Sequence, residues 1–186
     1  MHTPGFIAMI YDLIKASNTI VGNRLKFVID KINWTNINHV CDIGSWHLNQ
    51  TLEFQKLLPN CKYSVFEPDP RNFQACQYVH KSLPLHEQMN IEIFNMALGD
   101  LNGKIEFWPV DDNNPGASSK LKLMPQAVQE YWNATWSQSS SVQVESMQLD
   151  LWWTTSQKHP VDIIWIDVQG GEWDVFAYGQ KVLETT

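Results

Sequence analysis

Short apolar strands and helical segments alternate regularly along this chain from residue 39 onward. Apolar runs predict strands at 39–43, 62–67, 91–95 and 161–167. Between these runs, apolar residues recur at helical spacing. Strands that alternate with helices favour an α/β fold with a mainly parallel sheet and helices on both faces.

The 186 residues suit one domain of this kind, preceded by a helical segment over 1–38. Thr3-Pro4 is typical of a helix start, and the apolar residues of 6–14 repeat at helical spacing. The domain proper is then 39–186. Within it, 104–108 and 142–149 predict an antiparallel pair of strands. The long polar stretch 111–141 between them predicts a lid.

Charge and cysteine content argue against several classes of protein. The formal net charge is −7 and no basic stripe is present, which argues against a nucleic-acid partner. No apolar run approaches the roughly 18 residues of a membrane helix, and no signal peptide is recognisable. Three cysteines without C-x-x-C spacing indicate reduced thiols and a cytoplasmic protein. The six histidines are scattered, so no metal site is expected.

Polar residues and a glycine follow the predicted strands at their carboxyl ends, where such sheets bind ligands. They are Asp42 and Gly44, Glu67, Asn95 and Asp167. A carboxylate such as Glu67 can accept hydrogen bonds from both hydroxyls of a ribose. The first turn, 42–49, contains one glycine and a tryptophan instead of G-x-G-x-x-G, so it offers no cradle for a pyrophosphate. The pattern favours a nucleoside without phosphates over a nicotinamide cofactor.

Each of these residues also has a purely structural interpretation. Asp69 precedes Pro70 and fits the N-cap of a helix. Glu172 fits a partner of a helix dipole, and Gly44 fits a tight turn. Asp167 fits the cap of a strand end. The joint placement of the polar residues after successive strands favours a binding site.

Several segments resemble the FkbM-type family of S-adenosylmethionine-dependent methyltransferases, which have a class I, Rossmann-like fold. In the family's order they are DIGS at 42–45, VFEPDPRNF at 65–73, IFNMALGDLNGKIEFW at 93–108, GASSK at 116–120, VESMQLDLW at 144–152 and VDIIWIDVQGGEWDVFAYG at 161–179. The resemblance covers residues 39–186.

This resemblance implies that S-adenosylmethionine is the cofactor and that a hydroxyl of a small molecule or carbohydrate accepts the methyl group. The implied cofactor-binding residues are Asp42, Gly44 and Ser45 on the methionine side, Glu67 at the ribose, Pro68 and Asp69 beside the adenosine, and Asn95, Met96 and Ala97 near the adenine. The candidate catalytic residues are Asp167, which would face the reacting methyl group, and the nearby carboxylate Glu172.

The chain departs from the family's pattern at two positions. Leu48 or Asn49 stands where a second glycine is usual, and Gln169 stands where glutamate is usual. The chain also ends before the last strands of a seven-stranded class I sheet. An alternative therefore stays open, namely a non-catalytic Rossmann-like binding or assembly module derived from a methyltransferase.

The missing last strands carry a prediction of their own. Without them, the apolar strand Ile163–Ile166 would form an open edge of the sheet, and such edges pair with other chains. Aromatic residues nearby would add exposed surface; they are Trp152, Trp153, Trp173, Phe176 and Tyr178. We therefore expect a homodimer.

Overall fold

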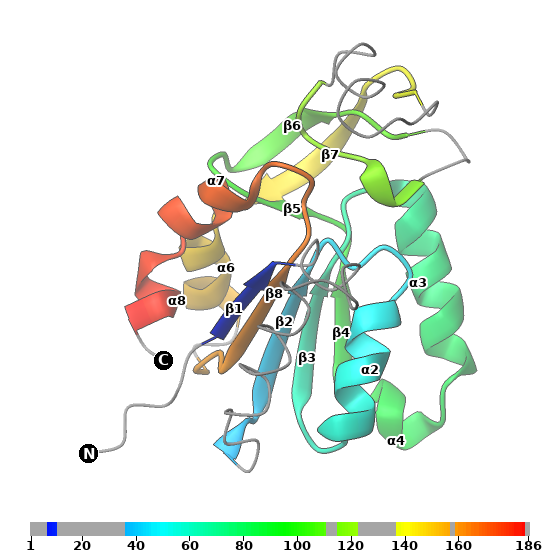
Figure 1. Ribbon diagram of the computed structural model, residues 1–186, viewed down its shortest axis with the longest axis vertical. Helices are drawn as coiled ribbons and strands as arrows, with labels where there is room; N and C mark the ends of the chain where they lie inside the picture. The colour runs from blue at the N-terminus through cyan, green and yellow to red at the C-terminus, as the bar shows by residue number, and fades with distance from the viewer. Residues whose placement is uncertain (1–6, 11–35, 111–114, 123–136, 157–158, 185–186) are drawn as a thin grey trace, which may run out of the picture.

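A computed structural model describes residues 7–10, 36–110, 115–122, 137–156 and 159–184 (Figure 1). Its main sheet has five parallel strands in the order β1-β8-β2-β3-β4. They are β1 (Ile7–Ile10), β2 (His39–Ile43), β3 (Lys62–Phe66), β4 (Ile91–Phe94) and β8 (Ile163–Ile166). The predicted α/β fold with a mainly parallel sheet is confirmed.

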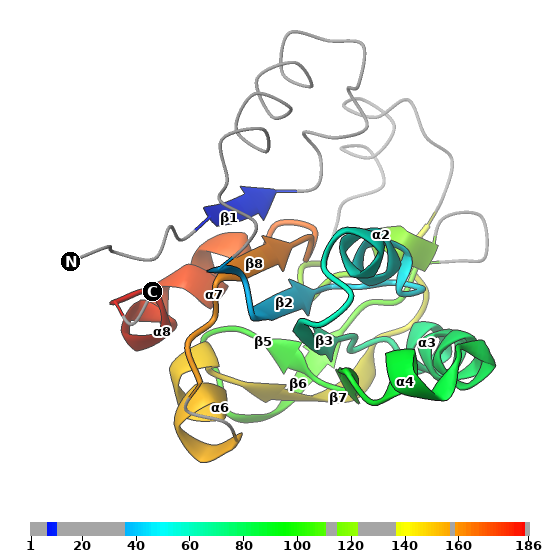
Figure 2. The same cartoon turned by 90° about the horizontal axis from the view of Figure 1, so that it is seen from below.

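Helices cover both faces of this sheet (Figure 2). One face carries α2 (Asn49–Leu57) and α3 (Pro70–Ser82), which is followed by the short α4 (Leu85–Gln88). The opposite face carries α6 (Leu149–Ser156), α7 (Glu172–Ala177) and α8 (Gln180–Glu184). Because successive side chains of a strand point to opposite faces, β2 contributes Val40 to one core and Cys41 to the other.

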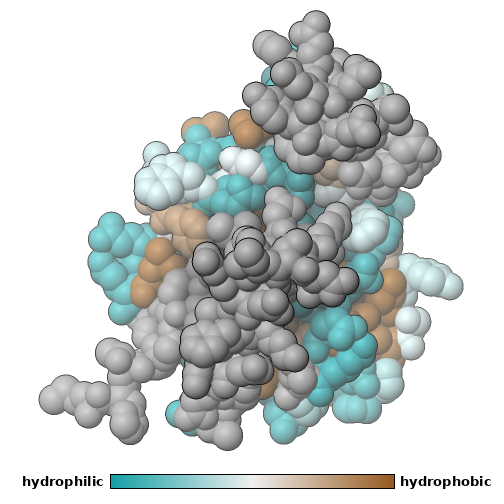
Figure 3. All heavy atoms as spheres, in the orientation of Figure 1, coloured by the Kyte–Doolittle hydropathy of each residue, from teal (hydrophilic) through white to brown (hydrophobic). Residues whose placement is uncertain are grey.

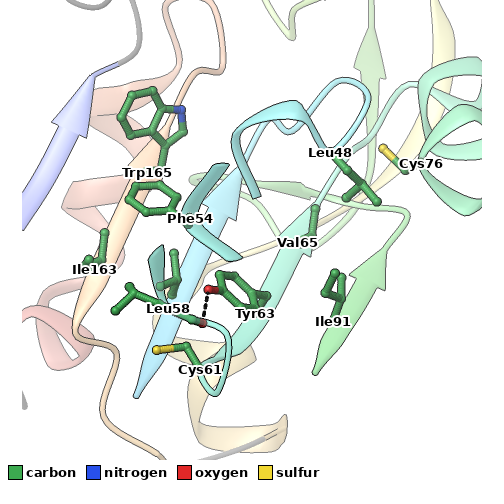
Figure 4. Close-up of a cluster of buried hydrophobic side chains, with 11 residues drawn as sticks. Leu48, Phe54, Leu58, Cys61, Tyr63, Val65, Cys76, Ile91, Ile163 and Trp165 are labelled. Carbon is green, nitrogen blue, oxygen red and sulfur yellow. Dashed lines mark hydrogen bonds between the residues drawn. The ribbon is translucent and has the colours of Figure 1, made fainter. Parts of the chain in front are cut away.

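The core beneath α2 and α3 is drawn in Figure 4. Phe54 of α2 packs edge-on against Trp165 of β8, with the ring centroids 5.8 Å apart. The hydroxyl of Tyr63 donates to the Leu58 carbonyl at 2.7 Å, which satisfies the only polar atom of that buried side chain. Burying one large apolar side chain stabilises a fold by roughly 1.5–3 kcal/mol, so this layer fixes α2 and α3 on the sheet.

A second sheet of three strands lies above the carboxyl ends of the main sheet in Figure 1. Its order is β5-β7-β6, with β5 (Ala97–Leu98), β6 (Gly103–Phe107) and β7 (Val142–Met147). The strands β6 and β7 are antiparallel, as the sequence predicts. However, β7 ends at Met147 and Leu149 begins α6, a helix that sequence analysis missed. Its buried residues, Leu149 and Trp152, form too short a pattern to predict a helix.

The N-terminal segment corrects one prediction. Ile7–Ile10 is not helical but forms β1, whose backbone pairs in parallel with Ile163–Ile166 of β8. A run of four apolar residues is ambiguous between helix and strand by periodicity alone. Pairing with an otherwise open strand satisfies backbone groups of β8, which a helix here would leave unpaired. The rest of the predicted helical segment, 1–6 and 11–35, lies outside the described residues, and the domain boundary at 39 stays a prediction.

The same pairing removes the premise of the predicted homodimer. The strand β8 has β1 on one side and β2 on the other, so it is not an edge. Trp152 is 1% exposed and belongs to the core, whereas Trp173 is 78% exposed. On the described part of the surface visible in Figure 3, hydrophobic side chains form small, separate patches. The pairing of β8 on both sides therefore does not support association through an open edge, although Trp173 and Tyr178 are exposed as expected.

Candidate active site

A cleft lies at the carboxyl ends of β2, β3 and β8, where the order of the strands reverses. It encloses about 560 Å³ of empty space, part of it open to solvent. Six of the sequence-predicted site residues line it: Gly44, Glu67, Pro68, Met96, Ala97 and Asp167. Among the described residues, the other five predicted ones, Asp42, Ser45, Asp69, Asn95 and Glu172, do not belong to its lining.

Gly44 brings the ends of β2 and β8 together. Its φ angle is +86°, in the region that favours glycine, and its amide donates to the Phe66 carbonyl at 2.9 Å. A Cβ atom at this position would overlap the backbone carbonyl of Asp167. The sequence suggested a glycine that makes room for a ligand, whereas the structure shows that the nearest constraint is the loop after β8.

Glu67 is the most constrained carboxylate of the cleft. Its side chain is 4% exposed and accepts hydrogen bonds from the backbone amides of Trp46, at 2.7 Å, and Asp69, at 2.9 Å. Burial raises the pKa of Glu67 to about 8, although these amides oppose the shift. The group is therefore held in one orientation, with lone pairs left for further donors.

The raised pKa makes a prediction for the stability of the protein without ligand. Between pH 4.5 and about 8 the folded chain keeps a proton on Glu67 that the unfolded chain has lost, so this group stabilises less as pH rises. We expect the Glu67→Gln variant to lose less stability than the parent between pH 5 and pH 8.5 in urea unfolding. Glu145→Gln, at an exposed position of β7, is the control. Equal pH dependence of all three proteins would contradict the prediction.

Asp42 lies beneath the turn after β2 and is fully buried. Its Oδ2 accepts from the hydroxyls of Ser45, at 2.9 Å, and Thr51, at 2.5 Å. Its Oδ1 is buried with no hydrogen-bond partner in the described part of the chain. Burial raises the pKa of Asp42 to about 6. Asp42 and Ser45 thus stabilise the turn after β2 through buried hydrogen bonds, and Oδ1 of Asp42 is left unsatisfied.

The turn itself explains how the chain manages without a second glycine. Leu48 adopts a left-handed conformation, with φ 64°, and its fully buried side chain joins the core under α2. Trp46 is also left-handed, with φ 56°, and lines the cleft. A leucine in this conformation costs roughly 1–2 kcal/mol, which burial of its side chain can offset.

Asp69 and Asn95 shape the loop after β3. Asp69 is the N-cap of α3, since its Oδ1 accepts from the Arg71 amide at 2.9 Å, so its structural interpretation is confirmed. Burial alone would raise the pKa of Asp69, but the hydrogen bonds and charge of Arg71 outweigh it and lower that pKa. The Asn95 amide donates to the carbonyls of Glu67 and Pro68 at 2.9 and 3.2 Å. The Asn95 side chain thereby holds the backbone at Glu67, whereas Asp69 contacts the Glu67 carboxylate through its backbone amide.

The loop after β8 carries the two candidate catalytic carboxylates in different settings. Asp167 lines the cleft, and the Gln169 side chain donates a hydrogen bond to its Oδ1. Glu172 accepts from the backbone amides of Val168, at 3.2 Å, and Gly170, at 3.0 Å. Its contacts are those of a residue that shapes the loop, while Asp167 is the carboxylate in the lining.

Other residues of the lining were not among the site residues predicted from the sequence. Trp46, Asn72, Gly116, Ser118 and Lys120 all line the cleft. Three of them come from the GASSK segment, whose resemblance to the family was visible although no spacing tied it to a strand end. The expected lid, 111–141, is described only at 115–122 and 137–141, and the first of these parts contributes the three lining residues.

The described residues contain neither a cluster suited to a metal ion nor a helix suited to a membrane. There, no group of three or more His, Cys, Asp or Glu side chains is placed to hold a metal ion. In the same ranges, no helix has the length and apolar character needed to cross a membrane.

A parallel sheet with helices on both faces and a cleft at its switch point defines an α/β protein of the Rossmann-like class. Within that class, the chain belongs to the FkbM methyltransferase family, because the model of the methyltransferase FkbM domain matches residues 38–185. The recognition made from the sequence is thereby confirmed.

Two known proteins are similar to the chain. The 2-O-methyltransferase NoeI of Sinorhizobium fredii (strain NBRC 101917 / NGR234) is 30% identical over 151 residues, which make up 79% of this chain and 59% of NoeI. The chain therefore spans little more than half the length of this relative. The crystal structure of methyltransferase FkbM from Methylobacillus flagellatus KT matches with a TM-score of 0.51 and 12% identity, over 79% of this chain and 30% of that one. This second likeness supports the fold.

Proposed function

We propose that this chain is the cofactor-binding part of an S-adenosylmethionine-dependent O-methyltransferase that acts on a hydroxyl of a small molecule or carbohydrate. The buried Glu67 carboxylate, in the lining of the cleft at the switch point, carries the proposal. When ionised, it is a pure acceptor and suits the two hydroxyls of a ribose. The family supports methyl transfer, and the name of the Sinorhizobium relative supports oxygen as the methylated atom.

The residues of the cleft fit this cofactor. Glu67 would hold the ribose, and Met96 and Ala97 would lie along the adenine. The unsatisfied Oδ1 of Asp42 is buried and outside the lining of the cleft, and would suit a donor such as the ammonium group reached through water. When bound, the cofactor supplies a methyl group on a sulfonium, a reactive group that the protein itself lacks.

Asp167 is our candidate for the acceptor side of the reaction. Its carboxylate lines the cleft and is oriented by Gln169. A carboxylate held in this way can orient a hydroxyl and take its proton as the oxygen attacks. Gln169, which replaces the glutamate usual in the family, thus has a function as a hydrogen-bond donor to Asp167. Glu172 would act through the loop backbone that it holds.

Calorimetric titration of the chain with S-adenosylmethionine and with S-adenosylhomocysteine tests the proposal. We expect both to bind in the micromolar range with one site per chain, which corresponds to about −8 kcal/mol. If neither binds to the folded chain at millimolar concentration, the proposal is wrong. The alternative, a non-catalytic module, is not favoured by the family match and the O-methyltransferase relative.

Two further parts of the proposal concern the location of the protein in the cell and its oligomeric state. We propose a cytoplasmic location on the basis of its three unpaired cysteines, all buried. The homodimer stays a prediction that light scattering at micromolar concentration tests, although the strand β8 does not support it.

A further inference from the structure

Residues 115–121 cross over the cleft and will be called the roof segment. It begins with the 3-10 turn Pro115–Ala117, and every second residue, Gly116, Ser118 and Lys120, lines the cleft. At one end, the Ser118 hydroxyl donates to Oδ2 of Asp69 at 3.0 Å, after β3. The roof segment is therefore attached to the side of the cleft that carries Glu67.

At its other end, three consecutive residues contact the loop and helix after β8. The Ser119 hydroxyl donates to the Gln169 carbonyl at 2.9 Å. Lys120 forms an ion pair with Asp174 in the first turn of α7. Leu121 lies against Gly170, so closely that a Cβ there would come within 2.9 Å of Leu121 Cδ1. This side of the cleft carries Asp167.

Lys120 makes a second ion pair, with Asp100, at 2.7 Å. Its side chain is 19% exposed. Burial alone would lower the pKa of Lys120, but the two carboxylates outweigh it and raise that pKa, so the group is a cation. A single ammonium thus joins the turn after β5, the roof segment and α7. The ammonium is partly buried, whereas the side chains of its partners Asp100 and Asp174 are 39% and 35% exposed.

The loop 167–171 needs such support. Gln169 and Gly170 have φ angles of 55° and 101°, and a non-glycine residue in the left-handed region is held there by its surroundings. The backbone of Asp167 is fixed by its amide, which donates to Ile43 at 2.8 Å. Beyond that point, the contacts of the roof segment and of Glu172 hold the loop.

We propose that Lys120 is a positioning residue of this site: its bridge between Asp100 and Asp174 fixes the loop 167–171 and α7 against the roof segment, and so sets the place of the Asp167 carboxylate. The proposal rests on the proposed function for the role of Asp167 on the acceptor side of the reaction. The bridge itself can be tested without any cofactor.

Amide hydrogen exchange of the unliganded chain is the first test. Lys120→Met keeps the apolar stem and removes the charge. We expect amides of 168–178 to exchange at least tenfold faster in this variant, with β2 and β3 unchanged, and Lys120→Arg to restore most of the protection. Lys56→Met, which removes an exposed ion pair with Glu53 on α2, is the matched control and should change nothing in 168–178. Unchanged exchange there in Lys120→Met would overturn the proposal.

A double-mutant comparison separates the bridge from a general loss of stability. Asp174→Asn alone should also accelerate exchange in 168–178, and adding it to Lys120→Met should accelerate exchange by much less than the product of the two single effects. Independent, multiplicative effects would contradict the bridge. Asp174→Asn also serves if Lys120→Met does not fold.

Titration with S-adenosylhomocysteine tests whether the Lys120 bridge affects ligand binding in the cleft. Lys120→Met should weaken binding at least fivefold and Lys120→Arg by less than twofold. If Lys120→Met binds as tightly as the parent, the bridge does not serve the site. If the parent chain itself binds neither S-adenosylhomocysteine nor S-adenosylmethionine, the proposed function fails, and the exchange experiment still decides whether Lys120 holds the loop.

Discussion

Replacing Gly44 with alanine is expected to lower the free energy of unfolding by about 3 kcal/mol or more. A loss of this size is expected because a steric overlap and an unfavourable backbone conformation act together. The left-handed conformation alone costs a non-glycine residue roughly 1–2 kcal/mol. In addition, the new Cβ would overlap the Asp167 carbonyl, a backbone atom that cannot move without displacing the loop after β8. For a chain of this size, such a loss lowers the midpoint of thermal unfolding by roughly 6–12 °C.

Gly103 provides a matched control for the Gly44 experiment. Its φ angle is +104°, yet apart from Gly103 itself and its two chain neighbours no atom of the described residues lies within 4 Å of the position that a Cβ would take. Gly103→Ala should therefore show the conformational cost without the steric one. Urea unfolding of both variants measures the difference. If Gly44→Ala is no more destabilised than Gly103→Ala, the close approach of β2 and the β8 loop is not needed for stability.

Replacing Glu67 with alanine is expected to weaken S-adenosylmethionine binding at least tenfold, about 1.4 kcal/mol. The substitution removes the only carboxylate at the end of β3 that lines the cleft among the described residues. It also leaves the amides of Trp46 and Asp69 without their acceptor, which loosens the turns after β2 and β3. Calorimetric titration measures the affinity.

Glu67→Gln and an unrelated substitution separate these causes. The glutamine keeps the shape and one acceptor oxygen, so we expect a smaller loss than for alanine. Glu145→Ala removes an exposed carboxylate on β7 and should leave the affinity unchanged. Circular dichroism must show that Glu67→Ala is folded at the temperature of the titration. A folded Glu67→Ala that binds as tightly as the parent would refute the assignment of Glu67 to the ribose.

Whether the role of a site residue could be predicted depends on how far away in the sequence its contacts lie. The N-cap Asp69 contacts residues two positions away, and its structural interpretation was visible in the dipeptide Asp69-Pro70. Lys120 contacts Asp100 and Asp174, which lie 20 and 54 residues away along the chain, and nothing in the sequence pointed to that bridge. Asp42 shows an intermediate case: its place at the end of β2 was predicted, but not its burial beneath the turn.

The alternation of strands and helices and the polar residues after the strands were determined by the sequence alone, because side-chain periodicity and turn residues act over a few positions. They sufficed for the parallel sheet, for the side of the sheet that carries the cleft, and for Gly44, Glu67 and Asp167. Tertiary structure alone decided that Ile7–Ile10 is a strand, because an open backbone edge 156 residues away in sequence outweighs a weak local preference. It also decided which carboxylates line the cleft and which ones support it from below, since that depends on burial and on partners brought together only by the fold.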